Sequence, residues 1–225
     1  MTLQSRIVSP RSCSRGALRE RVDLRTRFYA LWERLGAREE PGPVFDDLIA
    51  RYREPHRRYH TETHVEFGLS QLDLLAGTCQ HPDWVEFAFD YHDSVYVIGA
   101  ADNEERSAGL AIDTLKRAGV AGHIQSLIGG YIMVTKPGQE PSSADQRVMA
   151  DIDLAILGQE LPVFTEYERQ VREEYADVPE DAFWRQRKKI LGAFLWRPSV
   201  YSTSRFRQLY ERQARENLSG TIANH

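Results

Sequence analysis

The feature that most constrains this chain is the helical spacing of its apolar residues between short clusters of turn-forming residues. Val65, Leu69 and Leu72 follow the i, i+4, i+7 spacing that places side chains on one helical face. Similar patterns in the second half predict helices over 121–134, 143–157, 161–176, 180–196 and 204–218. A strand-like run at 94–98 has no partner segment of similar quality. The sequence therefore predicts an all-α protein built as a helical bundle.

In the first half of the chain, the spacing of apolar residues predicts helices separated by glycine and proline clusters. They are a helix that ends near Gly36, one around 44–49, one around 65–76, a buried helix from Trp84 to His92, and one that begins at Asp102 and ends at Gly119. Glu105 lies three residues after Asp102, which is the spacing of a capping box. We therefore expect the Asp102 side chain to cap its helix.

Length and composition indicate one globular domain. The chain has 225 residues, of which 41% are hydrophobic and 28% charged, and no repeat or low-complexity segment divides it. We expect residues 18–220 to form a single domain. The formal net charge of -4 argues against a general nucleic-acid or anionic-membrane binder. No apolar run is long enough to cross a bilayer.

The N-terminal segment, 1–17, is rich in Arg and Ser and is predicted to be a flexible basic arm. An organelle transit segment has a similar composition, but Glu20 and Asp23 interrupt the pattern here. Cys13 and Cys79 are the only cysteines and form no CxxC motif, which excludes a disulfide scaffold and a zinc ribbon. With no apolar secretory run, a cytoplasmic location is the default expectation.

Histidines and aspartates in apolar surroundings are the candidate chemistry. His60 and His64 are four residues apart, so on a helix they share one face, although such pairs often form only a half-buried polar stripe. His92 and Asp93 end a strongly apolar helix. A charge in such surroundings is costly unless it is paired or binds a metal. The alternative is a helix end with Asp93 simply solvated.

A second acidic pair, Asp151 and Asp153, lies within an apolar stretch. Residues two apart on a helix diverge by about 200°, so the two carboxylates cannot face one site. Leu154 and Leu157 flank the side of Asp153, so Asp153 is expected to face inward. Asp151 is then expected to support the site or to cap a helix.

Together His64, His92, Asp93 and Asp153 supply two imidazole nitrogens and two carboxylates. This mixture suits a divalent ion (Mn, Mg, Fe, Ni or Zn) and leaves coordination positions open for water and substrate. A closed structural zinc site fits less well, because such sites normally use cysteine.

The order H…HD…D resembles the signature of the HD superfamily of metal-dependent phosphohydrolases, and more narrowly a bacterial group described as predicted members of it. The matching segments are EPHRRYH (54–60), YHDSVY (91–96), DNEERSA (102–108), DIDLAILG (151–158), REEY (172–175) and ARENL (214–218). They span roughly residues 20 to 220. The resemblance implies an HD-domain helical bundle, a divalent metal cofactor and hydrolysis of a small phosphate ester, with a nucleotide as the expected class.

A more distant likeness implies individual roles. Tyr59-His60-x-x-x-His64 is similar to the YHNxxH segment of class I cyclic-nucleotide phosphodiesterases, and Asp153-Leu154-Ala155 to their DLSA stretch. Carried over, His60 is the general acid and His64 a metal ligand; the family's asparagine is Thr61 here. Asp93 and the metal are then expected to activate a water, while His60 protonates the departing oxygen.

Two further side chains are candidates for substrate binding. Arg57, or its neighbour Arg58, is placed to grip a phosphate, although a solvated arginine pair explains them equally well. Glu104 is placed to orient a substrate hydroxyl or a water, while Glu105 has the capping explanation given above. Basic residues between 169 and 189 alternate with aromatic ones, and an amphipathic helix explains this better than a nucleic-acid surface.

The expected partner is thus a small phosphorylated substrate, with no membrane and no nucleic acid, and a homodimer is left open. The alternative function is a metal- or nucleotide-binding HD regulatory module without turnover. A di-iron HD oxygenase ranks last, because such proteins usually need more histidines between His92 and Asp153, where only His123 occurs.

Overall fold

The computed structural model describes residues 23–75 and 77–225, and all regular structure in them is helical. This confirms the all-α prediction. The elements are α1 (Leu24–Arg34), α2 (Pro41–Tyr52), α3 (Glu62–Leu74), α4 (Pro82–Tyr91), α5 (Asn103–Arg117), α6 (Gly122–Met133), α7 (Ala144–Asp153), the 3₁₀ helix η1 (Leu154–Gly158), α8 (Leu161–Glu174), α9 (Glu180–Trp196) and α10 (Ser204–Asn224). The predicted arm, 1–17, lies outside the described residues.

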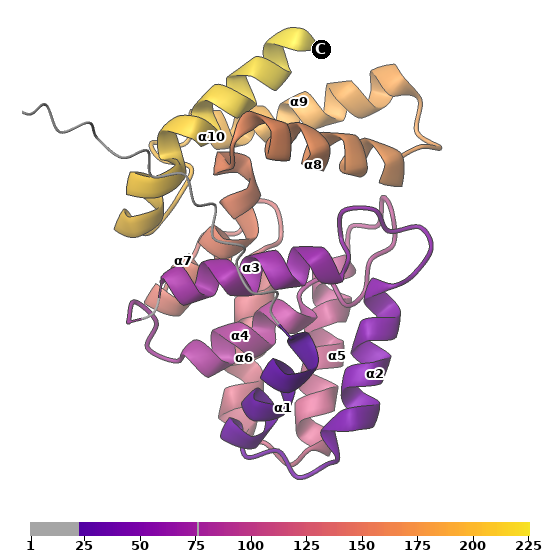
Figure 1. The fold of residues 1–225 in the computed structure, drawn as a ribbon, viewed down its shortest axis with the longest axis vertical. Helices are drawn as coiled ribbons and strands as arrows, with labels where there is room; N and C mark the ends of the chain where they lie inside the picture. The colour runs from indigo at the N-terminus through magenta and orange to yellow at the C-terminus, as the bar shows by residue number, and fades with distance from the viewer. Residues whose placement is uncertain (1–22, 76) are drawn as a thin grey trace, which may run out of the picture.

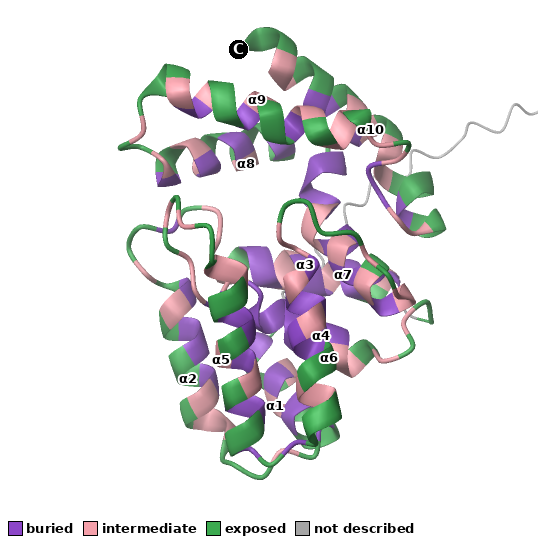
Figure 2. Ribbon diagram, turned by 180° about the vertical axis from the view of Figure 1, so that it is seen from behind, coloured by how far each residue is buried: buried purple, intermediate pink, exposed green. Residues whose placement is uncertain are grey.

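The helices form two groups joined by α7 and η1 (Figure 1). Helices α1 to α6 make the larger group, and α8, α9 and α10 lie above it in the view. Helix α4 is the centre of the larger group, since it packs against α1, α3, α5, α6 and α7. All its residues from Val85 to Tyr91 are buried, as the purple ribbon of Figure 2 shows. Such enclosure explains why this segment has almost no polar face.

Two turns between helices depend on glycine. Gly36, just after α1, has φ 70°, and Gly119, just after α5, has φ 76°. In this left-handed region a Cβ atom is strained, so glycine ends both helices where the sequence predicts.

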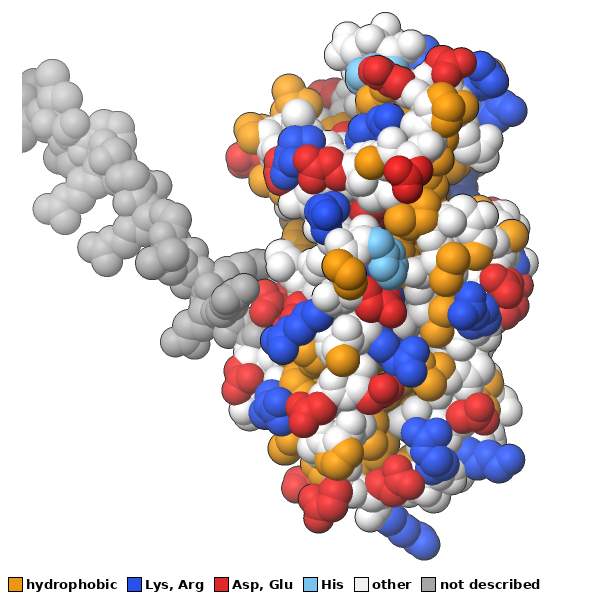
Figure 3. All heavy atoms as spheres, turned by 90° about the vertical axis from the view of Figure 1, so that its right-hand side faces the viewer, with side chains coloured by type: hydrophobic (Ala, Val, Ile, Leu, Met, Phe, Trp, Pro, Cys, Tyr) orange, Lys and Arg blue, Asp and Glu red, His pale blue; other side chains and the backbone are white. Residues whose placement is uncertain are grey.

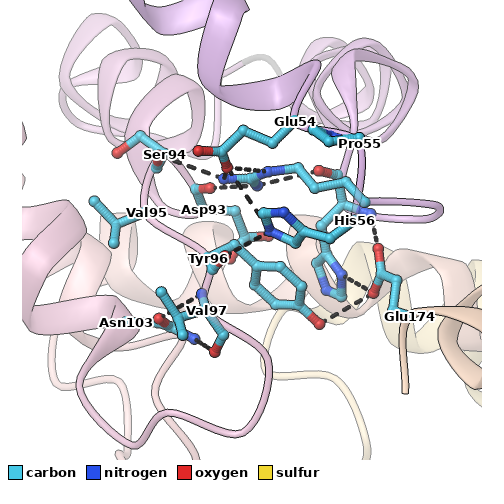
Figure 4. Close-up of polar contacts among 12 residues, drawn as sticks. Glu54, Pro55, His56, Asp93, Ser94, Val95, Tyr96, Val97, Asn103 and Glu174 are labelled. Atoms are coloured by element: carbon cyan, nitrogen blue, oxygen red, sulfur yellow. Dashed lines mark hydrogen bonds and ion pairs between the residues drawn. The ribbon is translucent and has the colours of Figure 1, made fainter. Parts of the chain in front are cut away.

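The capping box predicted for α5 is absent, and the prediction was wrong. Asp102 occupies the N-cap position but makes no side-chain capping hydrogen bond. Glu105 instead pairs with Lys136. The neighbouring Asn103 side chain accepts a hydrogen bond from the Val97 N–H and donates one to the Val97 carbonyl (Figure 4). The start of α5 is thus tied to the loop before it.

The α8–α10 group is anchored to α7 and η1 by buried polar side chains. Asp151 is fully buried and accepts hydrogen bonds from the Ser202 and Thr203 N–H groups, both at 2.7 Å, at the start of α10. Asn217 of α10 donates to the carbonyls of Leu157 and Gln159, both at 2.8 Å. These contacts fix the end of α7, and therefore the position of its last residue.

Close packing behind the candidate site gives a first testable prediction. A Cβ atom added at Gly68 of α3 would lie 2.0 Å from the ring of Phe89, which is fully buried on α4. We expect Gly68→Ala to lower the free energy of unfolding by about 1–3 kcal/mol, the usual cost of overpacking. Urea denaturation followed by circular dichroism measures this.

Gly109→Ala is the matched control, because a Cβ at Gly109 of α5 meets no atom within 4 Å. Alanine is the better helix former, so this variant should gain about 0.5–1 kcal/mol. Equal unfolding midpoints for the two variants would contradict the packing described here.

In the described part of the chain, no helix combines the length and apolar character that spanning a membrane requires.

Candidate metal centre

Three of the four side chains predicted from the sequence as metal ligands, His64, His92 and Asp153, come together, and Asp93 lies beside the two histidines. His64 lies in the first turn of α3, His92 directly follows α4, Asp93 comes next, and Asp153 is the last residue of α7. The imidazoles of His64 and His92 are buried, whereas the side chains of Asp93 and Asp153 keep 18% and 24% of their surface exposed. The site is therefore enclosed on the histidine side and open on the carboxylate side.

The ligand atoms lie at the separations that one bound ion requires. His92 Nε2 is 3.1 Å from His64 Nε2, 3.0 Å from Asp93 Oδ2 and 3.4 Å from Asp153 Oδ1. His64 Nε2 is 3.5 Å from Asp153 Oδ1 and 3.7 Å from Asp93 Oδ2.

Donor atoms about 2.1 Å from a common ion are separated by about 3.0 Å in an octahedron and about 3.4 Å in a tetrahedron. The observed distances fall at or just above these values. The group His64, His92 and Asp153 can therefore hold a divalent ion. Asp93 is outside that group, with its Oδ2 3.0 Å from His92 Nε2 and 3.7 Å from His64 Nε2.

Hydrogen bonding prepares His92 as a ligand. Its Nδ1–H donates to the Phe89 carbonyl at 2.7 Å, which leaves the Nε2 lone pair facing the cluster. The Phe89 ring also stacks on the His92 ring, with centroids 4.5 Å apart. His64 differs, because its buried Nδ1 has no hydrogen-bond partner among the described residues.

The electrostatics of the cluster favour a positive charge beside its carboxylates. Burial alone would raise the pKa of Asp153, but the two histidines outweigh it and lower that pKa to about 2. Burial alone would lower the pKa of His92, yet Asp93 and Asp153 raise it well above its ordinary value. A proton on His92 thus balances two carboxylates, and a metal ion would take over that charge and release the proton.

His60 lies beside this cluster but not on the helix expected for it. Helix α3 begins at Glu62, after Thr61 in extended conformation, so His60 belongs to the preceding loop. The prediction that both histidines share a helical face was wrong. The His60 and His64 rings are nevertheless only 6.0 Å apart between centroids, and the Tyr96 ring stacks on His60 at 4.2 Å.

Glu174, at the end of α8, fixes the His60 loop from the other helix group. One carboxylate oxygen accepts from the backbone N–H groups of Arg58, Tyr59 and His60 at 2.8–3.0 Å. The other accepts from His60 Nδ1 at 2.7 Å and from the Tyr96 hydroxyl at 3.0 Å, the latter visible in Figure 4. These bonds orient the His60 ring, and its Nε2 has no hydrogen bond to any residue in the described part of the chain.

The hydrogen bond between His60 and Glu174 also shifts the pKa of both side chains. Burial would lower the pKa of His60, but the hydrogen bond to Glu174 and the charge of Asp93 outweigh burial and raise it. Burial would raise the pKa of Glu174, but His60 lowers it to about 2. His60 therefore keeps its proton to higher pH than an ordinary histidine does.

Glu174 lies in the REEY segment (172–175), but the sequence predicts no role for it. The available signal was its place on the apolar face of α8: Phe164, Val171 and Glu174 are all buried, at helical spacing. A carboxylate on such a face needs a partner.

Arg57 does not take the substrate-binding position predicted for it. Its guanidinium is fully covered and does not line the cavity at the site. It donates to the carbonyls of His60 at 3.1 Å and Asp93 at 2.7 Å, and so joins the two loops of the site. Arg57 is therefore a positioning residue in this structure.

A cavity of about 360 Å³ opens over the cluster between the two helix groups. His60, His92, Asp93, Asp153 and the half-buried Glu104 contribute to its wall. Burial raises the pKa of Glu104. The cavity thus brings the candidate acid, the carboxylates of the cluster and one predicted substrate contact to the same space.

Three of the six basic residues of α8 and α9 are paired with acidic ones. Arg169 pairs with Glu166, Arg187 with Glu168, and Arg185 with Asp181 at 3.1 Å. Basic and acidic side chains are interspersed over the face shown in Figure 3. This pattern fits the amphipathic-helix explanation of these residues.

Comparison with known proteins adds no family to this description: no protein-family model, no curated protein and no solved structure matches the chain. The fold and the site together define an all-helical protein with a buried His64–His92–Asp153 group that can hold a metal ion.

Proposed function

We propose that this protein is a metal-dependent phosphohydrolase with an HD-type helical bundle, acting on a small phosphate ester, with a nucleotide as the substrate class. The observation that carries the proposal is the position of His60. An oriented imidazole, with its pKa raised, shares one cavity with His92, Asp93 and Asp153 of the cluster. A general acid beside a metal centre is what cleavage of a phosphate ester requires.

The division of roles follows from the chemistry of each residue. His64, His92, Asp93 and Asp153 would hold the ion, which when bound neutralises phosphate oxygens and lowers the pKa of water. Asp93 is partly exposed on the cavity wall and accepts a hydrogen bond from the attacking water. His60 gives its proton to the departing oxygen, while Glu174 holds the ring and compensates its charge.

Phosphate release from a panel of nucleoside mono-, di- and triphosphates, in the presence of Mn²⁺, Mg²⁺, Fe²⁺, Ni²⁺ or Zn²⁺, tests this function. The proposal predicts release by the parent protein and none by His92→Ala or Asp93→Ala. Stoichiometric metal or nucleotide binding without turnover of any ester would instead favour a regulatory module.

The Glu174 contact predicts a change in pH dependence. A general acid acts while protonated, so activity falls as the pH rises through the pKa of His60. Because Glu174 raises that pKa, Glu174→Gln should move the falling alkaline limb of kcat to lower pH. Initial rates between pH 5 and 10, about the useful range for a histidine, measure the shift.

Glu173→Gln is the matched control, since Glu173 is an exposed neighbour on α8 that pairs with Arg169. Its pH profile should coincide with that of the parent. An unshifted alkaline limb in Glu174→Gln would remove His60 from the role of general acid.

A further inference from the structure

A separate cavity of about 440 Å³ lies between α3 and α8, and we call it the α3–α8 cavity. Its wall comes from the first turns of α3, from α8, from η1 and from the loop before α3. His64 lines it but not the cavity over the metal centre, and Tyr167 is the one described residue that lines both. Its volume is within the range of about 300–1,000 Å³ that is typical of small-molecule sites. The α3–α8 cavity therefore has room for a ligand of its own.

A large part of this wall is apolar. Phe67, Ile156, Pro162 and Val163 line it. Val163, in the first turn of α8, keeps 49% of its surface exposed, which is unusual for a large apolar side chain. A ligand with an apolar body would cover this surface, and covering it is favourable.

Arg58 supplies the cavity with a positive charge that no side chain in the described part of the protein neutralises. Its Nη1 donates to the carbonyls of Pro55 at 2.7 Å and Arg57 at 2.9 Å, and within residues 23–75 and 77–225 it has no ion pair. The one carboxylate among the described residues of the wall is Glu166, which is paired with Arg169. The α3–α8 cavity is therefore suited to an anion.

The start of α3 adds hydrogen-bond donors to the same wall. Thr61 is the N-cap residue, lines the cavity and makes no side-chain capping hydrogen bond. The first N–H groups of a helix have no partner within it and attract anions. His64, in this first turn, is only 3% exposed, and its Nδ1 has no partner in the described part of the chain. A histidine that binds a metal through one nitrogen normally donates its other N–H to an acceptor, and an anion here would provide one.

We propose that the α3–α8 cavity binds a monocarboxylate with an unbranched apolar chain, such as a medium-chain fatty acid. The carboxylate lies between Arg58 and the first turn of α3, and the chain lies against Phe67 and Val163. One unpaired cation matches one negative charge, whereas a phosphate dianion would leave its second charge unpaired at an apolar wall. This site does not depend on the proposed phosphohydrolase function.

Binding of sodium octanoate, measured by isothermal titration calorimetry on the full chain, tests the charged end of the site. Arg58→Gln should bind octanoate about tenfold more weakly than the parent, the effect of losing a charge-assisted hydrogen bond. Arg106→Gln is the matched control, because Arg106 is also exposed, has no ion pair among the described residues and does not line the cavity. Equal affinity in these two variants would overturn the proposal.

Two glutamate variants of α8 test the apolar end. Val163→Glu places a like charge in the wall and should weaken octanoate binding at least about tenfold. Leu161→Glu adds the same charge two residues away, where Leu161 is 59% exposed and does not line the α3–α8 cavity. The Leu161→Glu protein should bind octanoate as the parent does. If both glutamate variants bound it equally well, the apolar chain would not lie in this cavity.

Three further ligands separate the charge from the chain. Acetate lacks the chain and 1-octanol lacks the charge, so each should bind at least about tenfold more weakly than octanoate. Octyl phosphate carries a second charge and should also bind more weakly. Tighter binding of octyl phosphate than of octanoate would overturn the assignment of a monocarboxylate.

Asp153→Ala separates this site from the metal centre, since Asp153 does not line the α3–α8 cavity. Its affinity for octanoate should equal that of the parent. Loss of octanoate binding together with loss of metal would place the carboxylate at the ion and overturn the proposal. A parent protein that binds octanoate in the predicted pattern but hydrolyses no phosphate ester would support this site and refute only the proposed function.

Discussion

Replacing His60 with asparagine lowers kcat by about 100- to 10,000-fold and leaves the metal content of the protein unchanged, if His60 is the proton donor. The leaving oxygen then has to depart without a positioned acid, while the cluster of His64, His92, Asp93 and Asp153 is untouched. Steady-state kinetics on the best substrate of the panel, with elemental analysis of the same sample, measure both quantities.

His123→Asn is the control for this variant. His123 lies near Trp84, with ring centroids 6.3 Å apart, and does not line the cavity at the metal centre. Its kcat should equal that of the parent. A His60→Asn protein as active as His123→Asn would remove the general acid from the mechanism.

We expect Asp153→Ala to lose bound metal and Asp151→Ala to lose stability, although the two residues are only two positions apart. Asp153→Ala removes a carboxylate from the cluster, so bound metal and activity should both disappear. Asp151→Ala leaves the cluster complete but deprives the Ser202 and Thr203 N–H groups of their acceptor. That variant should keep its metal and lose about 1–3 kcal/mol in the free energy of unfolding, the cost of unsatisfied buried donors.

Metal analysis and urea denaturation of the two variants separate these effects. The reverse pattern, with metal lost from Asp151→Ala and kept in Asp153→Ala, would mean that the metal-binding carboxylate has been assigned to the wrong residue.

The helices could be predicted because the apolar spacing that defines each one lies within a single short segment. Apolar spacing placed α8 and α9 within about two residues of their observed bounds, the usual precision of such predictions. The last helix, α10, continues to Asn224 beyond the expected residue 218. The divergence of Asp151 from Asp153 also followed from helical geometry alone.

The support of the site was not predictable in this way, because it depends on contacts between distant segments. Glu174 contacts His60, 114 residues away in sequence. No pattern in the residues around either one identifies the other as its partner. For Arg57 the sequence predicts a phosphate contact or, equally, a place in a solvated arginine pair. Its guanidinium is instead covered by the rings of Tyr52 and Tyr96, at 5.2 and 5.4 Å from their centroids.

The proposed chemistry depends on the binding of one divalent ion by His64, His92, Asp93 and Asp153. Elemental analysis of the purified protein beside His64→Ala tests it most directly. We predict close to stoichiometric divalent metal in the parent and almost none in the variant, with both proteins folded by circular dichroism. The same metal content in both would contradict the site on which the proposed chemistry depends.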